Sequence, residues 1–285
     1  VTGGSLVIVS GSTGSGKSSF YNTIINAHVN MGLPCDSWSG ENSVRVQINR
    51  IASTRTRIWG NDLKHGRFLD SENLIGDFEK AANDVVGSGA TFIAGGMTAS
   101  QVISRINYLH TTKGVKTFLF DRLELIDVSE FSRDVETGRA MLMERLRTLA
   151  VTLDIIVVMA CQLRKSYEDR VRCEPEIVDL KGTSAIGDSA THVYMLTRPE
   201  YHGITNDEEG RSTKGRGKIM LLKHTEGELV DVECLFTAPL TAWESDDNQT
   251  IIPELPSARQ PTPEPYGTHE VMRASRLNDD EDILF

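Results

Sequence analysis

The sequence predicts an α/β fold in which a mostly parallel central sheet carries helices on both faces and ends in antiparallel strands. Short apolar runs alternate with helical stretches over the first 161 residues. Each run is nearly continuous in apolar character, which is typical of strands buried on both faces of a parallel sheet. The last three runs follow one another without long helices between them, as antiparallel strands do.

The first strand is expected at residues 6–10, a short apolar run that leads into glycine. Further strands are expected at residues 35–39, 91–94, 115–120, 155–161, 191–196, 218–223 and 230–236. The longest apolar run, around residues 155–160, has the length of a strand and falls far short of the roughly 20 residues that a membrane span needs. No membrane partner is therefore expected.

Helices are expected between the strands. Met141, Leu142, Leu146 and Leu149 recur at helical spacing and define one apolar face of a helix over residues 137–153. The other helical stretches are residues 18–31, 44–55, 71–86 and 99–111.

Charge and proline content divide the chain into a globular domain, residues 1–243, and a disordered acidic tail, residues 244–285. The net charge is −10, and ten of the 40 acidic residues but only three of the 30 basic ones follow residue 243. Five of the nine prolines lie within residues 253–265. The globular part is thus nearly neutral and can still carry local basic patches.

The chain ends and the cysteines bear on where the protein acts. Four cysteines are far apart and form no Cys-x-x-Cys pair, which fits a reducing cytoplasm. The first ten residues lack the basic start and long apolar core of a signal peptide. Because the chain begins with Val and enters a strand almost at once, we expect it to be a piece of a longer protein.

The clearest motif is a phosphate-binding loop at residues 11–18, of the form G-x-x-x-x-G-K-[ST]. Glycines let backbone N–H groups turn toward phosphate oxygens, and the following helix presents its positive end to the same anion. Lys17 is suited to the terminal phosphates of ATP, and the Ser18 hydroxyl to Mg²⁺. The nucleotide-binding set is Gly11, Ser12, Thr13, Gly14, Ser15, Gly16, Lys17, Ser18 and Ser19.

A Mg·ATP site also needs a carboxylate on a neighbouring strand. Asp121 directly follows the strand expected at residues 115–120 and is the candidate for this Walker B role, with Ser18 as its partner in holding the metal. Glu124 and Asp127 lie beyond the strand end and are interpreted as helix-capping or solvated charges.

Two further strand ends carry polar candidates. Glu41 follows the strand at residues 35–39 and is suited either to deprotonate a water or to serve as a helix N-terminal charge. Gln162 closes the strand at residues 155–161 and is either a sensor of the terminal phosphate or a hydrogen-bonded strand-end amide. The residues alone leave both questions open.

The order of these motifs resembles the RecA-like motor domain of DnaB-type hexameric replicative helicases, particularly phage primase-helicases. The resemblance covers residues 3–243. It rests on the phosphate loop, Ser39-Gly40-Glu41, Phe120-Asp121-Arg122-Leu123-Glu124-Leu125, Ala160-Cys161-Gln162-Leu163-Arg164, Asp179-Leu180-Lys181-Gly182-Thr183-Ser184-Ala185-Ile186 and Lys223-His224-Thr225-Glu226-Gly227. The segment from Asp179 separates this family from other P-loop ATPases.

The resemblance implies an ATP-driven helicase that translocates 5′ to 3′ on single-stranded DNA as a homohexameric ring. It implies that Glu41 activates water, that Asp121 is the Walker B acid, and that Gln162 couples the terminal phosphate to DNA-binding loops. Those loops hold the DNA-contact candidates Arg164, Lys165, Arg170, Arg172, Lys181, Gly182, Thr183 and Ser184. Glycine and backbone N–H groups grip phosphates without reading bases, as a translocating motor requires.

One departure concerns a cation that the family inserts into the neighbouring subunit's ATP site. The family places a lysine and an arginine two residues apart, and here Lys223 is followed by Thr225. Three alternatives remain. Lys223 alone supplies the cation, or an arginine elsewhere such as Arg211 or Arg216 replaces the second one, or the match to the family's motif is out of register at this point.

The acidic C-terminal end, residues 279–285, resembles the partner-binding tails of single-strand-binding proteins and phage helicases. A DNA polymerase, a primase or a single-strand-binding protein is the expected partner, in a bacterial host cytoplasm if the chain is phage-encoded. The alternative for the tail is a solubilising segment. The alternatives for the whole chain are a RecA-like recombination ATPase, or a non-motor P-loop ATPase or loader module.

Overall fold

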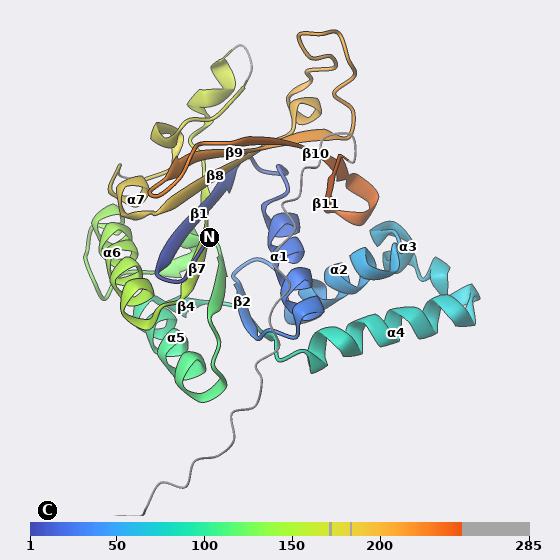
Figure 1. Ribbon diagram of the computed structural model, residues 1–285, viewed down its shortest axis with the longest axis horizontal. Coiled ribbons are helices and arrows are strands. Elements are labelled where there is room, and N and C mark those ends of the chain that lie inside the picture. Colours follow the sequence, from blue (N-terminus) through green and yellow to red (C-terminus); the bar gives the residue numbers. More distant parts are fainter. Residues whose placement is uncertain (171–172, 183, 247–285) are drawn as a thin grey trace, which may run out of the picture. The chain divides into compact units, whose positions relative to one another are not determined.

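The computed structural model describes residues 1–170, 173–182 and 184–246. A nine-stranded sheet with the order β11-β10-β9-β8-β1-β7-β5-β2-β3 forms its centre (Figure 1). The strands are β1 (Ser5–Gly11), β2 (Cys35–Ser39), β3 (Thr91–Ala94), β5 (Thr117–Asp121), β7 (Ile156–Gln162), β8 (His192–Thr197), β9 (Arg216–His224), β10 (Asp231–Thr237) and β11 (Ala242–Ser245). A separate short pair joins β4 (Met97–Thr98) to β6 (Ile126–Asp127).

Six neighbouring strands of the sheet run parallel, in the order β3, β2, β5, β7, β1 and β8. Strands β9, β10 and β11 continue the sheet beside β8 and pair antiparallel. Every residue of β1, β2 and β5 is buried. Both observations confirm the predicted fold class. The sheet is mostly parallel, is covered on both faces and ends in antiparallel strands.

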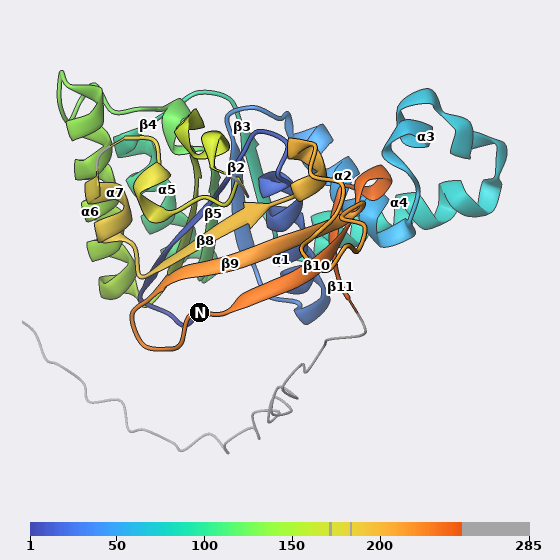
Figure 2. The same cartoon turned by 90° about the horizontal axis from the view of Figure 1, so that it is seen from above.

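Helices cover both faces of the sheet (Figures 1 and 2). The α-helices are α1 (Lys17–Met31), α2 (Val44–Thr56), α3 (Gly60–His65), α4 (Glu72–Gly87), α5 (Ala99–Lys113), α6 (Val135–Leu153) and α7 (Ser184–Ser189). One apolar core joins the sheet to α5, α6 and α7, and includes Val102, Leu142 and Ile186. The other core joins the sheet to α1, α2 and α4, and includes Ile25 and Ile51.

The expected elements match the structure to within two residues at each end, and the strands at 35–39 and 91–94 have the predicted bounds. The sequence did not indicate α3, α7, the β4–β6 pair or β11. Strand β11 continues to Ser245, two residues past the predicted domain boundary. The rest of the predicted tail lies outside the described residues.

Within the described part of the chain, none of the helices is both long and apolar enough to cross a bilayer. All four cysteines are free, and Cys35, Cys161 and Cys234 are buried.

Candidate functional site

The polar candidates meet at the carboxyl edge of the parallel strands because four strands end there in register. Gly11 of β1 lies opposite Gln162 of β7, and Ser39 of β2 lies opposite Asp121 of β5. Parallel strands bring the residues that follow them to one edge of the sheet, where α/β proteins bind their ligands. The phosphate loop leaves β1 at this edge and enters α1.

Two glycines allow the phosphate loop its close packing. Gly16 precedes α1 with φ of +94°, and a Cβ there would lie 2.8 Å from both Phe236 and Trp243. Gly14 has φ of +80°, and a Cβ there would lie 2.6 Å from the Tyr201 ring. A side chain at either position would meet both steric crowding and backbone strain. The antiparallel end of the sheet thus supports the loop from outside.

The Lys17 ammonium lies within the loop and donates to the carbonyls of Gly11 and Ser12, at 2.8 and 2.9 Å. Burial lowers the pKa of Lys17, and the negative charge of Asp121 partly opposes this effect. The Ser15 hydroxyl is buried in the same loop with no hydrogen-bond partner among the described residues. A desolvated cation and an unsatisfied hydroxyl both fit a phosphate ligand.

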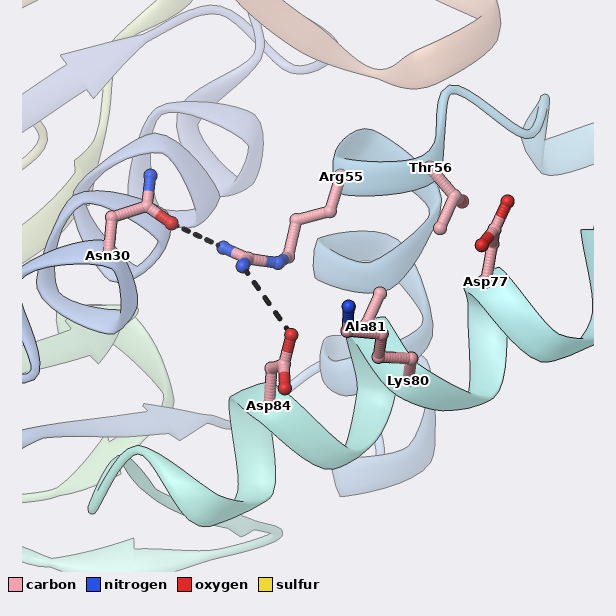
Figure 3. Close-up of a pocket in the computed structure, with 7 residues that line it drawn as sticks. All are labelled: Asn30, Arg55, Thr56, Asp77, Lys80, Ala81 and Asp84. Atoms are coloured by element: carbon pink, nitrogen blue, oxygen red, sulfur yellow. Dashed lines mark hydrogen bonds and ion pairs between the residues drawn. The ribbon is translucent and has the colours of Figure 1, made fainter.

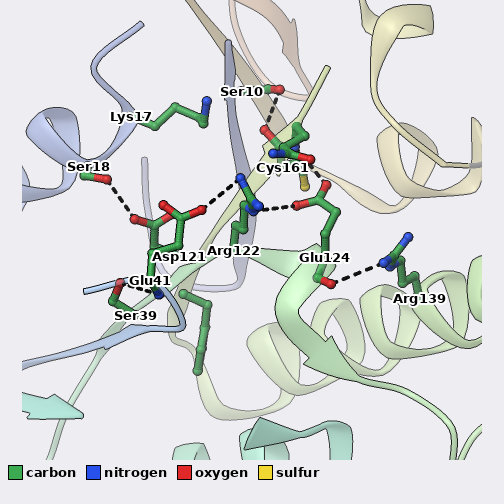
Figure 4. Close-up of polar contacts among 12 residues, drawn as sticks. Ser10, Lys17, Ser18, Ser39, Glu41, Asp121, Arg122, Glu124, Arg139 and Cys161 are labelled. Carbon is green, nitrogen blue, oxygen red and sulfur yellow. Dashed lines mark hydrogen bonds and ion pairs between the residues drawn. The ribbon is translucent and has the colours of Figure 1, made fainter. Parts of the chain in front are cut away.

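Ser18 and Asp121 are brought together as a metal site requires. The Ser18 hydroxyl donates to Oδ2 of Asp121 at 2.8 Å (Figure 4). Burial raises the pKa of Asp121, and the hydrogen bond from Ser18 opposes that shift. A hydroxyl next to a desolvated carboxylate is an oxygen donor set that suits Mg²⁺, so these two residues fit the ion.

Glu41 lies at the same edge, where its backbone N–H donates to the Ser39 hydroxyl at 3.3 Å. One pocket is lined by the phosphate loop together with Glu41, Asp121 and Arg122. Gln162 lines a neighbouring hollow with the loop residues Gly11, Ser12 and Thr13. The structure therefore brings together the predicted nucleotide, metal and catalytic residues, with the exception of Lys223.

Lys223 lies near the end of β9, toward the amino ends of the parallel strands and away from the edge that carries the phosphate loop. It is paired with Val193 near the start of β8, and its ammonium donates to the carbonyls of Gly187 and Asp188 at 3.0 and 2.8 Å. Since β8 runs parallel to β1, this position is remote from the phosphate loop of the same chain.

The two predicted DNA-binding loops are joined at the end of β7. The Arg164 N–H donates to the Asp179 carbonyl at 2.7 Å, and the Lys181 N–H donates to the Gln162 carbonyl at 2.9 Å. The Arg164 guanidinium donates to the carbonyl of Gly182. Lys165 and Lys181 are exposed at this surface.

The remaining DNA-contact candidates differ in their structural surroundings. Arg170 forms two hydrogen bonds to the Asp179 carboxylate, at 2.6 and 3.1 Å, and so braces the loop. Ser184 is the first residue of α7 instead of part of a loop. Arg172 and Thr183 lie outside the described residues.

Several residues at the site were not found from the sequence. Arg122 contacts Glu41, Gln162 and Glu124, and Arg50 lines the same pocket. Arg198 donates to the Gly14 carbonyl at 3.0 Å and lies 3.8 Å over the Phe236 ring. A charged residue directly after the Walker B acid was the available signal for Arg122, whereas the Arg198 contact depends on long-range packing.

The interpretation of Glu124 as a capping or solvated charge is wrong. Its side chain is 7% exposed, and Oε1 accepts the Gln162 N–H at 2.8 Å. The β5 chain turns back toward β7 at this point, which buries the carboxylate. Asp127 does act as a local cap, since it accepts the Ser129 N–H at 2.9 Å.

A second polar hollow lies between α1, α2 and α4 (Figure 3). Arg55 crosses it, donating to Asn30 at 2.7 Å and facing Asp84 at 4.0 Å. Asn30 is close to the C-terminal end of α1, whereas the phosphate loop is at the start of that helix. This hollow is therefore separate from the predicted nucleotide site.

A mostly parallel sheet with a G-x-x-x-x-G-K-S loop between its first strand and helix defines a P-loop nucleotide-binding domain. Residues 1–245 match the family model described as the DnaB-like helicase C terminal domain. The chain belongs to this family, which confirms the resemblance drawn from its motifs.

Individual proteins that are similar in sequence to this chain are replicative helicases by name. A probable plasmid replicative DNA helicase of Chlamydia psittaci is 26% identical over 238 residues, covering 82% of this chain and 50% of that protein. The replicative DNA helicase DnaB of Haemophilus influenzae is 23% identical over 248 residues, covering 84% of this chain and 51% of that protein. The chain spans about half the length of the curated relatives it matches.

Solved structures share the fold. The ATPase domain of G40P superposes with a TM-score of 0.76 at 18% identity, covering 85% of this chain and 84% of that chain. A DnaB-like replicative helicase, described with its interactions with primase, gives a TM-score of 0.77 at 17% identity and covers 86% of this chain and 58% of that one.

Proposed function

We propose that this chain is the ATP-driven motor of a replicative DNA helicase, which translocates 5′ to 3′ on single-stranded DNA as a hexameric ring. The observation that carries the proposal is the convergence of Lys17, the Ser18–Asp121 pair and Glu41 at one edge of the sheet, next to the loop that holds Lys181. A nucleotide site in contact with a basic loop is what a nucleic-acid motor needs.

Each residue has a role in this proposal. The phosphate loop and Lys17 bind the phosphates of ATP, and Ser18 and Asp121 hold Mg²⁺. The metal, when bound, neutralises charge that develops on the phosphate oxygens. Glu41 accepts the proton of the attacking water, and Gln162 responds to the terminal phosphate.

The position of Lys223 is compatible with a ring. Its place in β9 is away from its own phosphate loop, so in this proposal it acts on the nucleotide of a neighbouring subunit. Arg211 is a less suitable substitute for the missing second cation, since Asp207 and Glu209 both pair with it. Arg216 likewise faces Asp246 at 3.3 Å.

We further propose that the acidic C-terminal end, residues 279–285, docks on a DNA polymerase, a primase or a single-strand-binding protein in a bacterial cytoplasm. Deleting residues 279–285 should leave ATP hydrolysis unchanged and weaken binding to that partner. Partner affinity that survives the deletion would reduce the tail to a solubilising segment.

Strand displacement tests the helicase proposal. The protein with Mg·ATP should release the strand of a forked duplex that carries a 5′ single-stranded tail, and should fail with ADP. Electron microscopy with an ATP analogue and single-stranded DNA should show closed rings. Filaments would favour a recombination ATPase, and a protein that neither binds DNA nor separates strands would favour a loader module.

A further inference from the structure

Arg122 is a junction between the residues expected to act on ATP. It follows the last residue of β5 and precedes the short helix η2 (Leu123–Leu125). Its Nη1 lies 2.9 Å from Oε1 of Glu41, and its Nη2 lies 3.2 Å from the Gln162 amide oxygen, with the amide turned to face the guanidinium. Figure 4 shows the ion pair between Arg122 and Glu41. One cation therefore joins the expected base to the expected phosphate sensor.

The two acidic partners of Arg122 are unequal. The Glu124 carboxylate is 7% exposed and is fixed by the Gln162 N–H at 2.8 Å, whereas that of Glu41 is 42% exposed. Arg122 Nε is 3.7 Å from Oε2 of Glu124, and neither atom has a hydrogen-bond partner among the described residues. Glu124 is thus the fixed partner, Glu41 is the solvent-facing one, and a buried donor of Arg122 is still unsatisfied.

A phosphate group would compete well for this guanidinium. Arginine binds phosphate oxygens through paired N–H bonds, and such charge-assisted pairs are stronger than neutral hydrogen bonds. An ion pair with a half-exposed carboxylate is weak in water, so exchanging Glu41 for a phosphate costs little. Arg122 lines the same pocket as Lys17 and Ser18, which places it beside the predicted phosphate site.

We propose that Arg122 is a phosphate-binding residue supplied by the same chain, which moves from Glu41 to the terminal phosphate of ATP and thereby frees Glu41 to accept a proton. This inference rests on the proposed function. In the reaction the water oxygen bonds to the terminal phosphorus while the bond to the bridging oxygen breaks. ADP takes that electron pair, and the water proton goes to Glu41.

The move also reaches the basic loop. Gln162 faces Arg122 through its side chain, and its carbonyl accepts the Lys181 N–H at 2.9 Å. A change of partner at Arg122 therefore alters the restraint on the end of β7 and on the loop beyond it. Arg122 couples phosphate binding to the surface that is expected to hold DNA.

The test compares affinity for a non-hydrolysable ATP analogue with affinity for ADP, both with Mg²⁺, by titration calorimetry. Arg122→Gln should lower the preference for the triphosphate about tenfold or more, while ADP affinity stays within about twofold of the parent. Arg122→Lys keeps the charge but not the paired N–H groups, so its preference for the triphosphate should lie between those of the parent and Arg122→Gln. Arg133→Gln, an exposed arginine ahead of α6, is the control and should match the parent.

Turnover gives the second readout. Arg122→Gln should lower kcat for ATP about a hundredfold or more, as loss of a phosphate-binding arginine does. Equal losses of analogue and ADP affinity would mean that Arg122 only supports the fold. A higher kcat in Arg122→Gln would mean that it only restrains Glu41, and either result overturns the proposal.

The two readouts separate this inference from the proposed function. If the parent protein neither unwinds DNA nor responds to it, the ratio of analogue to ADP affinity still reports on Arg122. Circular dichroism checks that Arg122→Gln folds, and Arg122→Lys makes the same comparison if it does not.

Discussion

The Ser18 hydroxyl donates a 2.8 Å hydrogen bond to Oδ2 of Asp121, although 103 positions separate the two residues in the chain. Parallel packing of β1 and β5 on either side of β7 creates this contact. It is the structural core of the proposed Mg·ATP site, because it joins the phosphate loop to a buried carboxylate.

Removing the hydroxyl should therefore impair metal-dependent binding of nucleotide. Ser18→Ala deletes one expected Mg²⁺ ligand and leaves Asp121 without its hydrogen-bond donor. We expect the affinity for Mg·ATP to fall about tenfold, which corresponds to roughly 1.4 kcal/mol. Calorimetric titrations over a range of Mg²⁺ concentrations measure this, with Thr23→Ala on the same helix as the control. An unchanged Mg²⁺ requirement would remove Ser18 from the metal site.

Glu41 should affect turnover and not binding. Glu41→Gln keeps the size of the side chain but cannot accept a proton at neutral pH. The variant should bind Mg·ATP like the parent and hydrolyse it at least about a hundredfold more slowly. Single-turnover hydrolysis measures the chemical step. Hydrolysis at the parent rate would show that the water is activated by another group.

Lys181 should contribute to DNA binding through the phosphate backbone. Lys181→Ala should weaken binding of single-stranded DNA about equally for different sequences and reduce the salt dependence of that binding by about one charge. Fluorescence anisotropy at several salt concentrations measures both effects. Lys113→Ala, an exposed lysine at the end of α5, is the matched control. Unchanged affinity in Lys181→Ala would favour the non-motor alternative.

His192 should make stability depend on pH. Burial, followed by the charge of neighbouring His224, lowers the pKa of His192 from an ordinary value of 6.5 to about 4, while Glu226 opposes the shift. Between these two values the unfolded chain binds a proton that the folded chain does not. The free energy of unfolding should therefore fall as the pH drops from about 6.5 to about 4, by at most roughly 1.4 kcal/mol per pH unit.

Urea unfolding of the parent and of His192→Asn at several pH values isolates this contribution. Carboxylates also titrate in this pH range, so the relevant quantity is the difference in unfolding free energy between the parent and His192→Asn. It should shrink as the pH falls. A constant difference would show that His192 affects stability by packing alone, for example against the His224 ring 4.6 Å away.

The sequence was sufficient wherever a property is local. Apolar runs and helical periodicity placed the main strands and helices, and the glycine and lysine spacing identified the phosphate loop. The extension α3 was missed because its six residues have no buried side chain and hence no apolar pattern. The short β4–β6 pair depends on contacts between Met97 and Ile126, which no local pattern indicates.

The sequence predicted which residues form the site but not which of them contact one another. Glu41, Asp121 and Gln162 could be named because each follows a strand. The burial of Glu124 and the contacts of Arg122 depend on the chain path after β5, which brings residues from three strand ends together. The charge directly after the Walker B acid was a signal for Arg122, but spacing and composition do not reveal which residues it contacts.

The response of ATP hydrolysis to single-stranded DNA tests the central claim most directly. If the nucleotide site and the Lys181 loop form one motor, saturating single-stranded DNA at low salt should raise the hydrolysis rate of the parent severalfold. Lys181→Ala should need a higher concentration of DNA to reach the same stimulation. A parent rate that is indifferent to DNA under those conditions would contradict the account.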